Sequence, residues 1–497
     1  MPSKLLAPYA TLALLLGISF QALAEGYYWH IQPEAYDWTE SQKKHSSPEL
    51  ACRSLHTDTE YGEYEYYTAT PTSSENQWTC NLIYGPDPNE DNLALSIHRY
   101  GDSCERNTLF NPLSGQCENQ STDEIFCISQ TVGNPINFLT GYKIQIEQDL
   151  PLSTTAAKNK LKFIKYYSSV NGLWTHSYSD RTITNGKTIT LVHSNGERSL
   201  FDKESGSYVA RHPRAGSISK ISNTWVYLAA DNSTLSFDST GRLLEFKNHE
   251  TKYSITYTDK HLKITNAHGD TLEVFEDTKK QPLKVKTNNI ELTYDYNKYK
   301  QLVSMTRALH DSSQIKRYLY EDDNDSRFLT GIIDERGVLY ATWKYDQHGR
   351  AISSEHAQGA ENVTIEYHPD NSTTVSNALG KSTTYKFGYF QGTKRIISII
   401  GEPTANCPKS DSTFTYDERG LLTSQTDSKG ITTLYAHNDR GLETSRTEAS
   451  NTPESRTITT EWHDTLSLPL KIKQPKRSIQ YTYDAEGRKL TQTIKTH

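Results

Sequence analysis

A short turn motif that recurs at a near-constant interval constrains this chain more than any other feature of its sequence. The motif is an aromatic residue followed by Asp, two variable residues and Gly. Its clearest copies pair Asp238 with Gly241, Asp346 with Gly349, Asp417 with Gly420, and Asp484 with Gly487. An Asp carboxylate caps backbone N–H groups two residues on, and Gly supplies the positive φ of a bulged hairpin loop. Each copy therefore predicts a β-hairpin.

The spacing of these turns predicts a repeat. Asp346 and Asp417 are 71 residues apart, or about three units of 24, and Asp238 and Asp346 are 108 apart, or about five units of 22. A degenerate copy begins at His437, and the stretch Tyr294–Lys298, which lacks the Gly, marks a worn one. Further turns fall at half phase: 266–269, 334–337, 377–380 and 427–430. Because one hairpin is too small to be stable alone, neighbouring units must pair into one long sheet.

The segments between the turns have the pattern of β-strands. Residues 254–258 and 478–483 alternate polar residues with aliphatic or aromatic ones, and no 11-residue window after residue 150 shows a helical stripe. The chain has 32 Tyr against 13 Phe, and a buried Tyr hydroxyl needs a partner, which favours half-wet β-surface over a dry core. We therefore predict an all-β fold, in which a small disulfide-stapled N-terminal module precedes a curved, spiralling antiparallel sheet.

The first 24 residues are typical of a secretory signal peptide. Lys4 precedes an apolar run of 11 residues from Ala10 to Phe20, and Ala22-Leu23-Ala24 forms a small-residue cleavage site before Glu25. The run is too short to span a bilayer, and an uncleaved anchor is the alternative interpretation. We expect an exported protein, periplasmic, extracellular or at the cell surface, with no membrane span after cleavage.

The six Cys residues fit export, because disulfides persist in oxidising compartments. Short loops favour the pairs Cys52–Cys80 and Cys104–Cys117, which leaves Cys127 for Cys407 as a hypothesis. Zinc is the competing interpretation, although no Cys-x-x-Cys occurs in the sequence. The loop between Cys104 and Cys117 resembles the short Cys-bounded loop of some chitin-binding modules, and a stapled turn is the alternative.

Charge and aromatic content bear on the kind of partner. A balance of 53 basic against 60 acidic residues gives no broad electrostatic footprint for nucleic acid. The aromatic-rich stretch 25–129 could stack on sugar rings, with Trp29, Trp38 and Trp78 as the possible glycan contacts. A glycan-binding adhesin is therefore the alternative function.

The recurring turns resemble the Tyr-Asp repeats of the Rhs/YD-repeat family, which includes bacterial Rhs and insecticidal toxin-complex shells and the animal teneurins. Residues 132–141, followed by 161–167 and 172–178, resemble the domain that opens the shell in bacterial members. Residues 334–346 also read like a family block, and the resemblance covers about residues 130–497. It implies a spiralling β-sheet cocoon that, in bacterial toxins, encloses a C-terminal effector.

The sequence departs from the family pattern at its C-terminal end. It stops at His497 directly after a repeat, without the closing autoproteolytic block of Rhs shells and without a toxin domain. We therefore expect an open shell fragment, which is either a truncated reading frame or a piece whose terminal strand pairs with a separate shell or effector polypeptide. The expected organisation is a signal peptide at 1–24, a Cys-rich module at 25–129, a shell-opening domain at 130–230 and a repeat array at 231–497.

No constellation of residues commits the chain to a reaction, a cofactor or a metal. His176 is interpreted as a structural hydrogen-bond partner, and Glu321–Asp325 as a solvated acidic turn that lacks the Gly and Glu of a calcium loop. The basic stretch 471–477 is interpreted as Lys residues that blunt an edge strand. The function expected is that of a secreted, non-enzymatic structural or interaction protein, part of a β-shell for effector encapsulation or surface contact.

Overall fold

The computed structural model describes most of the chain after residue 129 and short stretches before it. The described residues are 27–31, 44–45, 47–56, 66–72, 76–83, 93–101, 108–111, 116–119, 130–150, 161–259, 261–287, 290–308, 312–391, 393–401 and 411–497. The predicted signal peptide at 1–24 and Trp38 lie outside them. None of the described residues forms a helix long and apolar enough to cross a membrane.

The N-terminal module is a small sheet with one helix against it. Four of its strands pair in the order β1-β4-β3-β2, and two more form a separate hairpin. A disulfide joins Cys52 on the helix to Cys80 on β3, which is the pairing that the short loop favoured. The elements are β1 (Tyr28–Ile31), α1 (Pro48–His56), β2 (Tyr66–Pro71), β3 (Gln77–Ile83), β4 (Leu93–Tyr100), β5 (Thr108–Asn111) and β6 (Gln116–Asn119).

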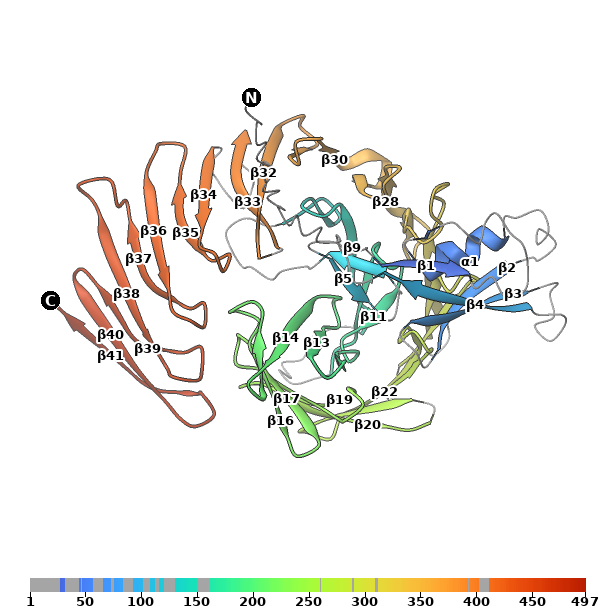
Figure 1. Ribbon diagram of the computed structural model, residues 1–497, viewed down its shortest axis with the longest axis horizontal. Helices are drawn as coiled ribbons and strands as arrows, with labels where there is room; N and C mark the ends of the chain where they lie inside the picture. The colour runs from blue at the N-terminus through green and yellow to red at the C-terminus, as the bar shows by residue number, and fades with distance from the viewer. Residues whose placement is uncertain are drawn as a thin grey trace, which may run out of the picture.

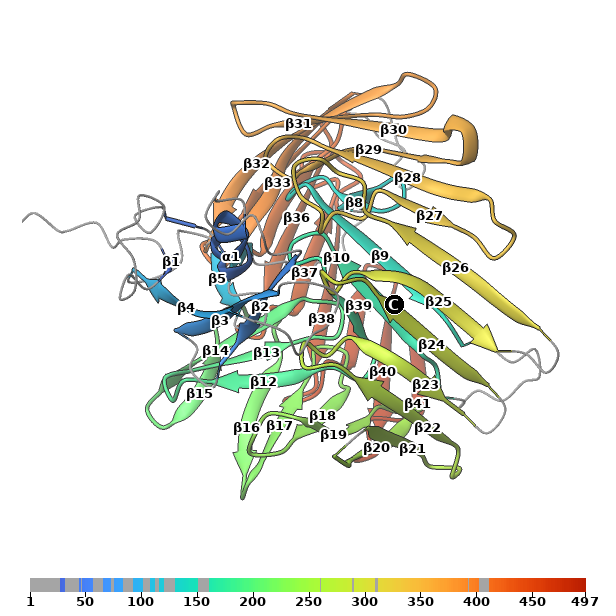
Figure 2. The same ribbon diagram turned by 90° about the vertical axis from the view of Figure 1, so that its right-hand side faces the viewer.

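Two short sheets follow the module. The first has the order β11-β10-β9-β8-β7 and the second the order β12-β13-β14-β15. We call the described residues 130–150 and 161–182 the plug, because they lie inside the curve of the large sheet (Figure 2). The strands are β7 (Thr131–Val132), β8 (Ile136–Asn137), β9 (Tyr142–Gln148), β10 (Ile164–Ser168), β11 (Trp174–His176), β12 (Arg181–Thr184), β13 (Thr188–Val192), β14 (Arg198–Glu204) and β15 (Ser207–Ala210).

The rest of the chain forms one antiparallel sheet of 26 strands, in which each strand pairs with its neighbours in sequence (Figure 1). We call this sheet the wall. Its first strands are β16 (Ser217–Ile221), β17 (Thr224–Leu228), β18 (Thr234–Phe237), β19 (Leu243–Lys247), β20 (Lys252–Tyr257), β21 (Leu262–Asn266), β22 (Thr271–Glu276), β23 (Pro282–Lys286), β24 (Glu291–Tyr296), β25 (Leu302–Ala308), β26 (Ser313–Leu319), β27 (Gly331–Ile333) and β28 (Leu339–Tyr345).

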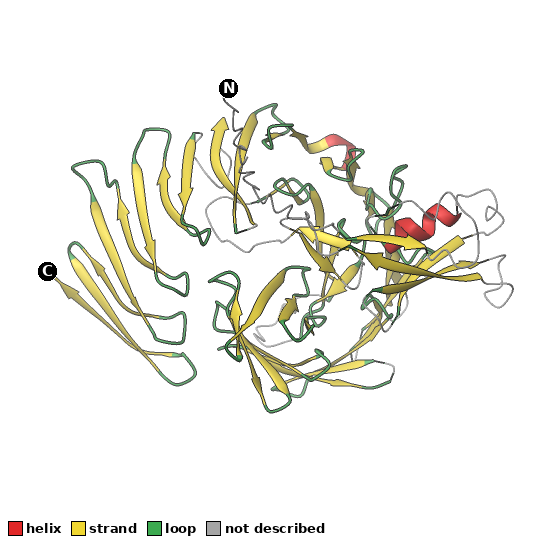
Figure 3. Ribbon diagram, viewed as in Figure 1, coloured by secondary structure: helices red, strands yellow, loops and turns green. Residues whose placement is uncertain are grey.

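The second half of the wall continues the meander without a crossover. Among the residues described in this half, the helix content is one short 3-10 turn, η2 (Ala357–Gly359) (Figure 3). Its strands are β29 (Ala351–His356), β30 (Ala360–Tyr367), β31 (Thr373–Ser376), β32 (Ser382–Phe390), β33 (Thr393–Gly401), β34 (Ser412–Tyr416), β35 (Leu422–Thr426), β36 (Thr432–His437), β37 (Glu443–Glu448), β38 (Arg456–Trp462), β39 (Pro469–Gln474), β40 (Arg477–Tyr483) and β41 (Lys489–Thr496). The predicted all-β fold with one long curved sheet is confirmed.

The hydrophobic core lies between the plug and the inner face of the wall. Plug aromatics stack on wall aromatics, as Phe138 does on Tyr385 with ring centroids 4.2 Å apart. Trp174 meets Tyr318 edge-on at 5.1 Å. One continuous cluster of buried side chains runs from Ile136 in the plug through the wall to Leu422. The plug therefore supplies the second layer that a single sheet needs to bury its apolar face.

The wall closes a full circuit and begins a second one. Because strands alternate in direction, the Asp-x-x-Gly turns all lie on one rim, the main rim, and the half-phase turns lie on the opposite rim. The main-rim turns at 438–442 and 463–468 meet the opposite rim of the first strands. Ser467 N donates to Asn232 Oδ1 at 2.6 Å, and Arg214 Nε donates to Gly441 O at 3.3 Å. The wall is therefore a spiral whose second turn rests on the first, and we call this contact the seam.

The N-terminal module touches the main rim of the first turn. Lys279 Nζ lies 3.0 Å from Glu49 Oε1 on α1, and Arg53 Nη1 donates to Asn324 O at 3.3 Å. Both wall residues belong to main-rim turns. The N-terminal module therefore lies against the main rim of the wall. Figure 2 shows α1 and β2 on that side of the molecule.

Candidate functional site

The Asp turns have one repeated geometry. At Asp346, Oδ1 accepts the N–H groups of His348 and Arg350 at 2.9 Å each, and Oδ2 accepts Arg350 Nε at 2.8 Å. Gly349 has φ +74°, which places it in the left-handed region. Partial burial would raise the pKa of Asp346, but the bonds from Arg350 outweigh it and lower the pKa. The same turn, with Gly at positive φ, occurs at Asp238, Asp417 and Asp484.

The worn copy predicted at Tyr294–Lys298 does mark a turn, although Tyr294 and Asp295 themselves lie within strand β24. The turn begins two residues later at Asn297, whose Oδ1 accepts the N–H groups of Tyr299 and Gln301. Lys300 takes the place of Gly with φ +62°. An amide oxygen can replace the carboxylate, and a non-Gly residue can adopt the left-handed conformation at a small cost. The copy is therefore degenerate in sequence but complete in geometry.

A ladder of Tyr hydroxyls ties each repeat to an earlier one. In most cases, a Tyr just before a main-rim turn donates to the backbone carbonyl of the strand residue that follows an earlier main-rim turn. Trp462 replaces Tyr once, and its Nε1 donates to Glu443 O at 2.8 Å. These bonds give the hydroxyls of these Tyr residues the hydrogen-bond partners that a Tyr needs when its ring is buried. The pairs are Tyr257–Leu243 (2.9 Å), Tyr296–Pro282 (2.8 Å), Tyr345–Leu329 (2.8 Å), Tyr367–Ala351 (2.8 Å), Tyr416–Ile396 (2.8 Å) and Tyr483–Pro469 (2.9 Å).

A buried ionic cluster joins the plug to the wall. Lys165 of β10 is fully buried, with Nζ 2.6 Å from Glu147 Oε2 and 2.7 Å from Asp149 Oδ1. From the wall, Tyr318 Oη donates to Glu147 at 2.6 Å and Tyr294 Oη donates to Asp149 at 2.8 Å. Each of these charged groups therefore has several partners, which is the condition for burying an ion pair. The cluster fixes where the plug sits along the wall.

The charges in this cluster shift one another's pKa values. Burial would raise the pKa of Glu147, but Lys165 and then Lys316 outweigh it and lower the pKa to about 2. Burial opposes the charge of Lys165 as well, yet Asp149 and Glu147 raise its pKa. The sequence analysis did not find this cluster. One available signal was a Glu and an Asp at alternate positions of one strand, and register places Lys165 directly opposite Glu147 on the next strand.

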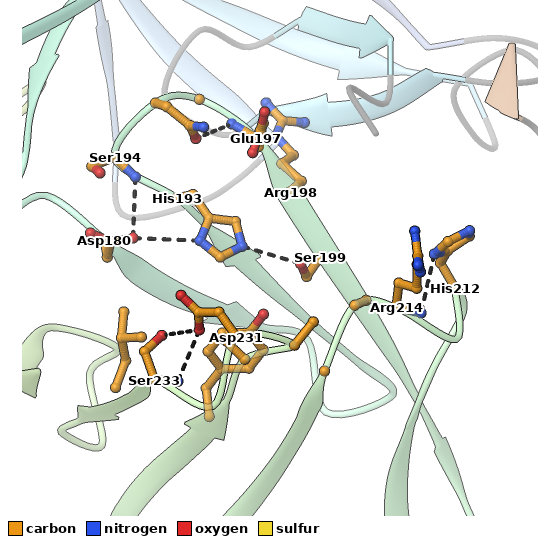
Figure 4. A pocket seen from close by; sticks show the side chains of 18 of the residues that line it. Asp180, His193, Ser194, Glu197, Arg198, Ser199, His212, Arg214, Asp231 and Ser233 are labelled. Carbon is orange, nitrogen blue, oxygen red and sulfur yellow. Dashed lines mark hydrogen bonds and ion pairs between the residues drawn. The ribbon is translucent and has the colours of Figure 1, made fainter. Parts of the chain in front are cut away.

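A cavity of about 1310 Å³ opens inside the spiral. The plug, the β13–β14 hairpin, the first wall strands and the main-rim turns of the second circuit all contribute to its lining. Figure 4 shows His193 between Asp180 and Ser199 on one side of it. His193 Nδ1 lies 3.6 Å from Asp180 Oδ1, and Nε2 lies 3.1 Å from Ser199 Oγ. An acid, an imidazole and a hydroxyl in that order invite comparison with a serine hydrolase.

The same arrangement recurs where no cavity lining is involved, which gives it a structural explanation. His193 and His368 each occupy the first position of a bulged hairpin turn. His368 Nε2 lies 2.8 Å from Thr374 Oγ1, six residues on, as Ser199 is from His193, and its Nδ1 lies 3.6 Å from Glu366. The His–hydroxyl contact is therefore a product of hairpin geometry. It holds the two strands together at the turn.

The remaining candidates from the sequence are placed as follows. Trp29 and Trp78 are each 1% exposed and pack against one another in the core of the N-terminal module, so the interpretation of these two rings as glycan contacts is wrong. They are buried because a sheet this small needs its largest side chains to form a core at all. The side chains of Cys104, Cys117, Cys127 and Cys407 lie outside the described residues.

His176 and the acidic turn have structural contacts. His176 Nε2 lies 2.7 Å from Glu276 Oε1 and links β11 of the plug to β22 of the wall. Asp322 Oδ1 accepts the N–H groups of Asn324 and Asp325 at 2.9 and 3.1 Å, which makes it a turn cap. Nowhere among the described residues do three His, Cys, Asp or Glu side chains gather in a way that could hold a metal ion.

The basic stretch 471–477 does not lie on an edge strand, so that interpretation is wrong. Strand β39 pairs with β38 on one side and with β40 on the other. Lys471 instead contacts Glu461 across the strand pair at 3.4 Å. The strand at the end of the sheet is β41.

Comparison with known proteins identifies the repeat. Residues 416–453, which hold the turns at Asp417 and Asn438, match the family model described as RHS Repeat. The chain therefore contains an RHS repeat at residues 416–453. No curated protein matches the sequence.

Three solved structures contain chains that resemble this RHS-repeat chain at 10–11% identity. For TcdB2-TccC3-Cdc42 and TcdB2-TccC3 the TM-scores are 0.26 and 0.27, with 83% and 85% of this chain covered. For the Tc holotoxin pore of Photorhabdus luminescens with a mutation in TccC3, the TM-score is 0.23 and the cover is 91%. The chain spans 27%, 26% and 34% of the length of those chains. Because these scores are below 0.5, the arrangement of the wall is taken from its own strand order.

Proposed function

We propose that this chain is a secreted, non-enzymatic wall of a β-shell that encloses or displays a partner polypeptide. The observation that carries the proposal is the seam, where Ser467 of the second circuit bonds to Asn232 of the first. A sheet that returns on top of itself encloses space, and the cavity of about 1310 Å³ lies within it. The RHS repeat at 416–453 agrees with a structural role.

The organisation proposed for the chain follows from this role. Residues 1–24 direct export, 25–129 form a stapled module, 130–230 hold the plug and the sheet after it, and 231–497 form the repeat array. The contacts of Lys279 with Glu49 and of Arg53 with Asn324 support a module that rests outside the shell at the main rim. N-terminal sequencing of the exported protein should begin at Glu25.

The proposal of no catalytic role rests on what the polar side chains already do. Asp residues of the repeats cap turns, and His176 joins plug to wall. The His193–Ser199 pair is accounted for by its hairpin, as the matching pair at His368 indicates. In each case a structural bond occupies the group that catalysis would need.

Co-expression tests the enclosing role. The full chain is produced with the polypeptide encoded immediately downstream, and the rate at which a protease cleaves that polypeptide is measured with and without the shell. We expect protection when the shell is present, and weaker protection when the seam is loosened by Asn232→Gly. Equal cleavage with and without the shell would contradict enclosure. The matched control is Asn371→Gly, which alters the equivalent position of a turn away from the seam.

A second candidate function is glycan binding by the N-terminal module. A stacked pair of Tyr rings supports it. Tyr100 is 44% exposed and stacks on Tyr28 with ring centroids 5.9 Å apart and planes 20° apart. His30 meets both rings edge-on, at 5.1 and 5.5 Å. Coplanar exposed rings can stack on a sugar face. A glycan array probed with the full chain should show binding that Tyr100→Ala removes and Tyr340→Ala, an exposed wall Tyr, leaves intact. A blank array would dismiss this candidate.

A further inference from the structure

The second circuit of the wall has an apolar inner face that nothing in the described chain covers. From residue 432 to 496, all of which are described, Ser478 is the one strand residue that is buried. The buried core ends at Leu422, and Tyr435 is the last side chain that packs against it. The wall therefore extends past the plug, which is the second layer that covers the inner face of the first circuit.

The pairing register of these strands identifies which of their residues lie on the inner face. Tyr435 lies opposite Arg446, and Arg446 lies opposite Ile458, so all three share the face that meets the core. Two positions further along β38, Thr460 lies opposite Ile472, Ile472 opposite Ile479, and Ile479 opposite Ile494. We call Ile458, Ile472, Ile479, Tyr481 and Ile494 the inner strip.

The opposite face of the same strands is polar. Thr459 and Glu461 on β38, Lys473 on β39, and Gln480 and Thr482 on β40 are all exposed. Along β39 and β40, Ile472, Ile479 and Tyr481 alternate with polar residues, which is the pattern of a sheet with one covered face and one solvated face. In the first circuit the plug covers the equivalent face. Uncovered, a row of Ile side chains such as Ile494, which is 53% exposed, leaves apolar surface in water.

We infer that the inner strip is the docking surface for an extended apolar segment of the enclosed polypeptide. This inference rests on the proposed function. The inner strip is the part of the shell that contacts the enclosed polypeptide. Continuity with the plug interface indicates the chemistry of the occupant. On the first circuit the same face receives strands that alternate aromatic side chains with polar ones, as Phe163 and Trp174 pack on Tyr294 and Tyr318. The occupant of the inner strip is a segment of that kind.

The chain supplies its own probe for this surface. A fluorescent peptide with the sequence of residues 161–178 has the chemistry of the plug strands, and the first circuit is already occupied by the plug itself. We expect the peptide to bind the full chain, with anisotropy as the readout. The double variant Ile472→Ser/Ile479→Ser should weaken binding by about tenfold or more, because half-buried Ile side chains lose their apolar contact.

The control variant changes the other face of the same two strands. Lys473→Ser/Gln480→Ser should leave peptide affinity within about twofold. Circular dichroism establishes that both variants fold. Absence of peptide binding to the unaltered chain, or equal loss in the two variants, would overturn the inference. So would a dimer of the unaltered chain in sedimentation that the inner variant dissociates, because a second copy would then be the occupant. Peptide binding without protection of the downstream polypeptide would refute enclosure but leave the docking surface standing.

Discussion

At the residue scale, each repeat depends on one carboxylate that accepts several bonds at once. Replacing Asp346 by Ala leaves the N–H groups of His348 and Arg350 without their acceptor. We expect a loss of about 1–2 kcal/mol in the free energy of unfolding, measured by urea titration. Asp346→Asn keeps the acceptor oxygen and should lose less than half as much. Equal losses in Asp346→Ala and Asp346→Asn would contradict this account. The control is Asp323→Ala at an exposed position, which should change the free energy of unfolding by less than about 0.5 kcal/mol.

Two glycines separate backbone strain from packing. Gly349 and Gly337 have similar φ values of +74° and +79°. A Cβ at Gly349 would lie 2.7 Å from Phe328 Cζ, whereas one at Gly337 would meet nothing within 4 Å. We expect Gly337→Ala to cost about 1 kcal/mol from left-handed strain, and Gly349→Ala to cost at least about 1 kcal/mol more. Urea unfolding of the pair would refute this if Gly337→Ala were the more damaging.

The plug cluster makes stability depend on acidity. The pKa of Glu147 is about 2 in the folded chain, below the value of about 4.3 for a free Glu. A depressed pKa contributes stability that is complete above the unfolded value and is lost as pH falls through the folded one. The advantage of the unaltered chain over Glu147→Gln should therefore be about 3 kcal/mol at neutral pH and shrink between about pH 4.3 and 2.

Thermal unfolding across that pH range measures the effect. The control is exposed Glu454→Gln, whose small effect on stability should not vary with pH over the same window. A Glu147→Gln penalty that stays constant down to pH 2 would mean that folding does not lower the pKa of this carboxyl group.

At the element scale, the Tyr ladder adds a side-chain bond between strands that already pair in the sheet, as Tyr367 of β30 does with Ala351 of β29. Tyr367→Phe removes the donor to Ala351 O and leaves that carbonyl unpaired. We expect a loss of about 1 kcal/mol, measured by urea unfolding. Tyr389→Phe, at a ring that is 52% exposed, should have almost no effect. A similar loss at both positions would show that the hydroxyl bond contributes nothing of its own.

The elements themselves were accessible from the sequence. Turn chemistry is local, so Asp346 and Gly349 indicated a hairpin without knowledge of anything else. The worn copy at Tyr294–Lys298 was predicted, but its turn was placed early because the Gly position holds Lys300, and only backbone geometry shows that Lys300 is left-handed. The stretch 471–477 was wrongly assigned to an edge strand. An edge strand lacks a pairing partner on one side, and the local sequence does not show whether such a partner is present.

At the scale of the whole molecule, the seam decides whether the second circuit is held in place. Asn232 and Asn371 occupy the same position of equivalent turns, with φ +67° and +64°, but Asn232 is the one that accepts from Ser467. Asn232→Gly should speed amide hydrogen exchange in β38 to β40 by about fivefold, while β20 to β22 stay protected. Asn371→Gly should leave both regions unchanged. If Asn232→Gly changed the exchange rate equally in all strands of the wall, the seam would not hold the second circuit in place.

What the sequence determined by itself was the strand, the turn and their order, because these depend on contacts between residues close in the chain. The all-β fold and the continuous meander follow from that order alone. Only the tertiary structure decided the circumference of the spiral, the meeting of Asn232 with Ser467, and the burial of Lys165 between Glu147 and Asp149. Small twists add up over many strands, so curvature is a sum that no single repeat reveals. The burial of Trp29 and Trp78 belongs to the same class, since a ring is inside or outside according to what folds over it.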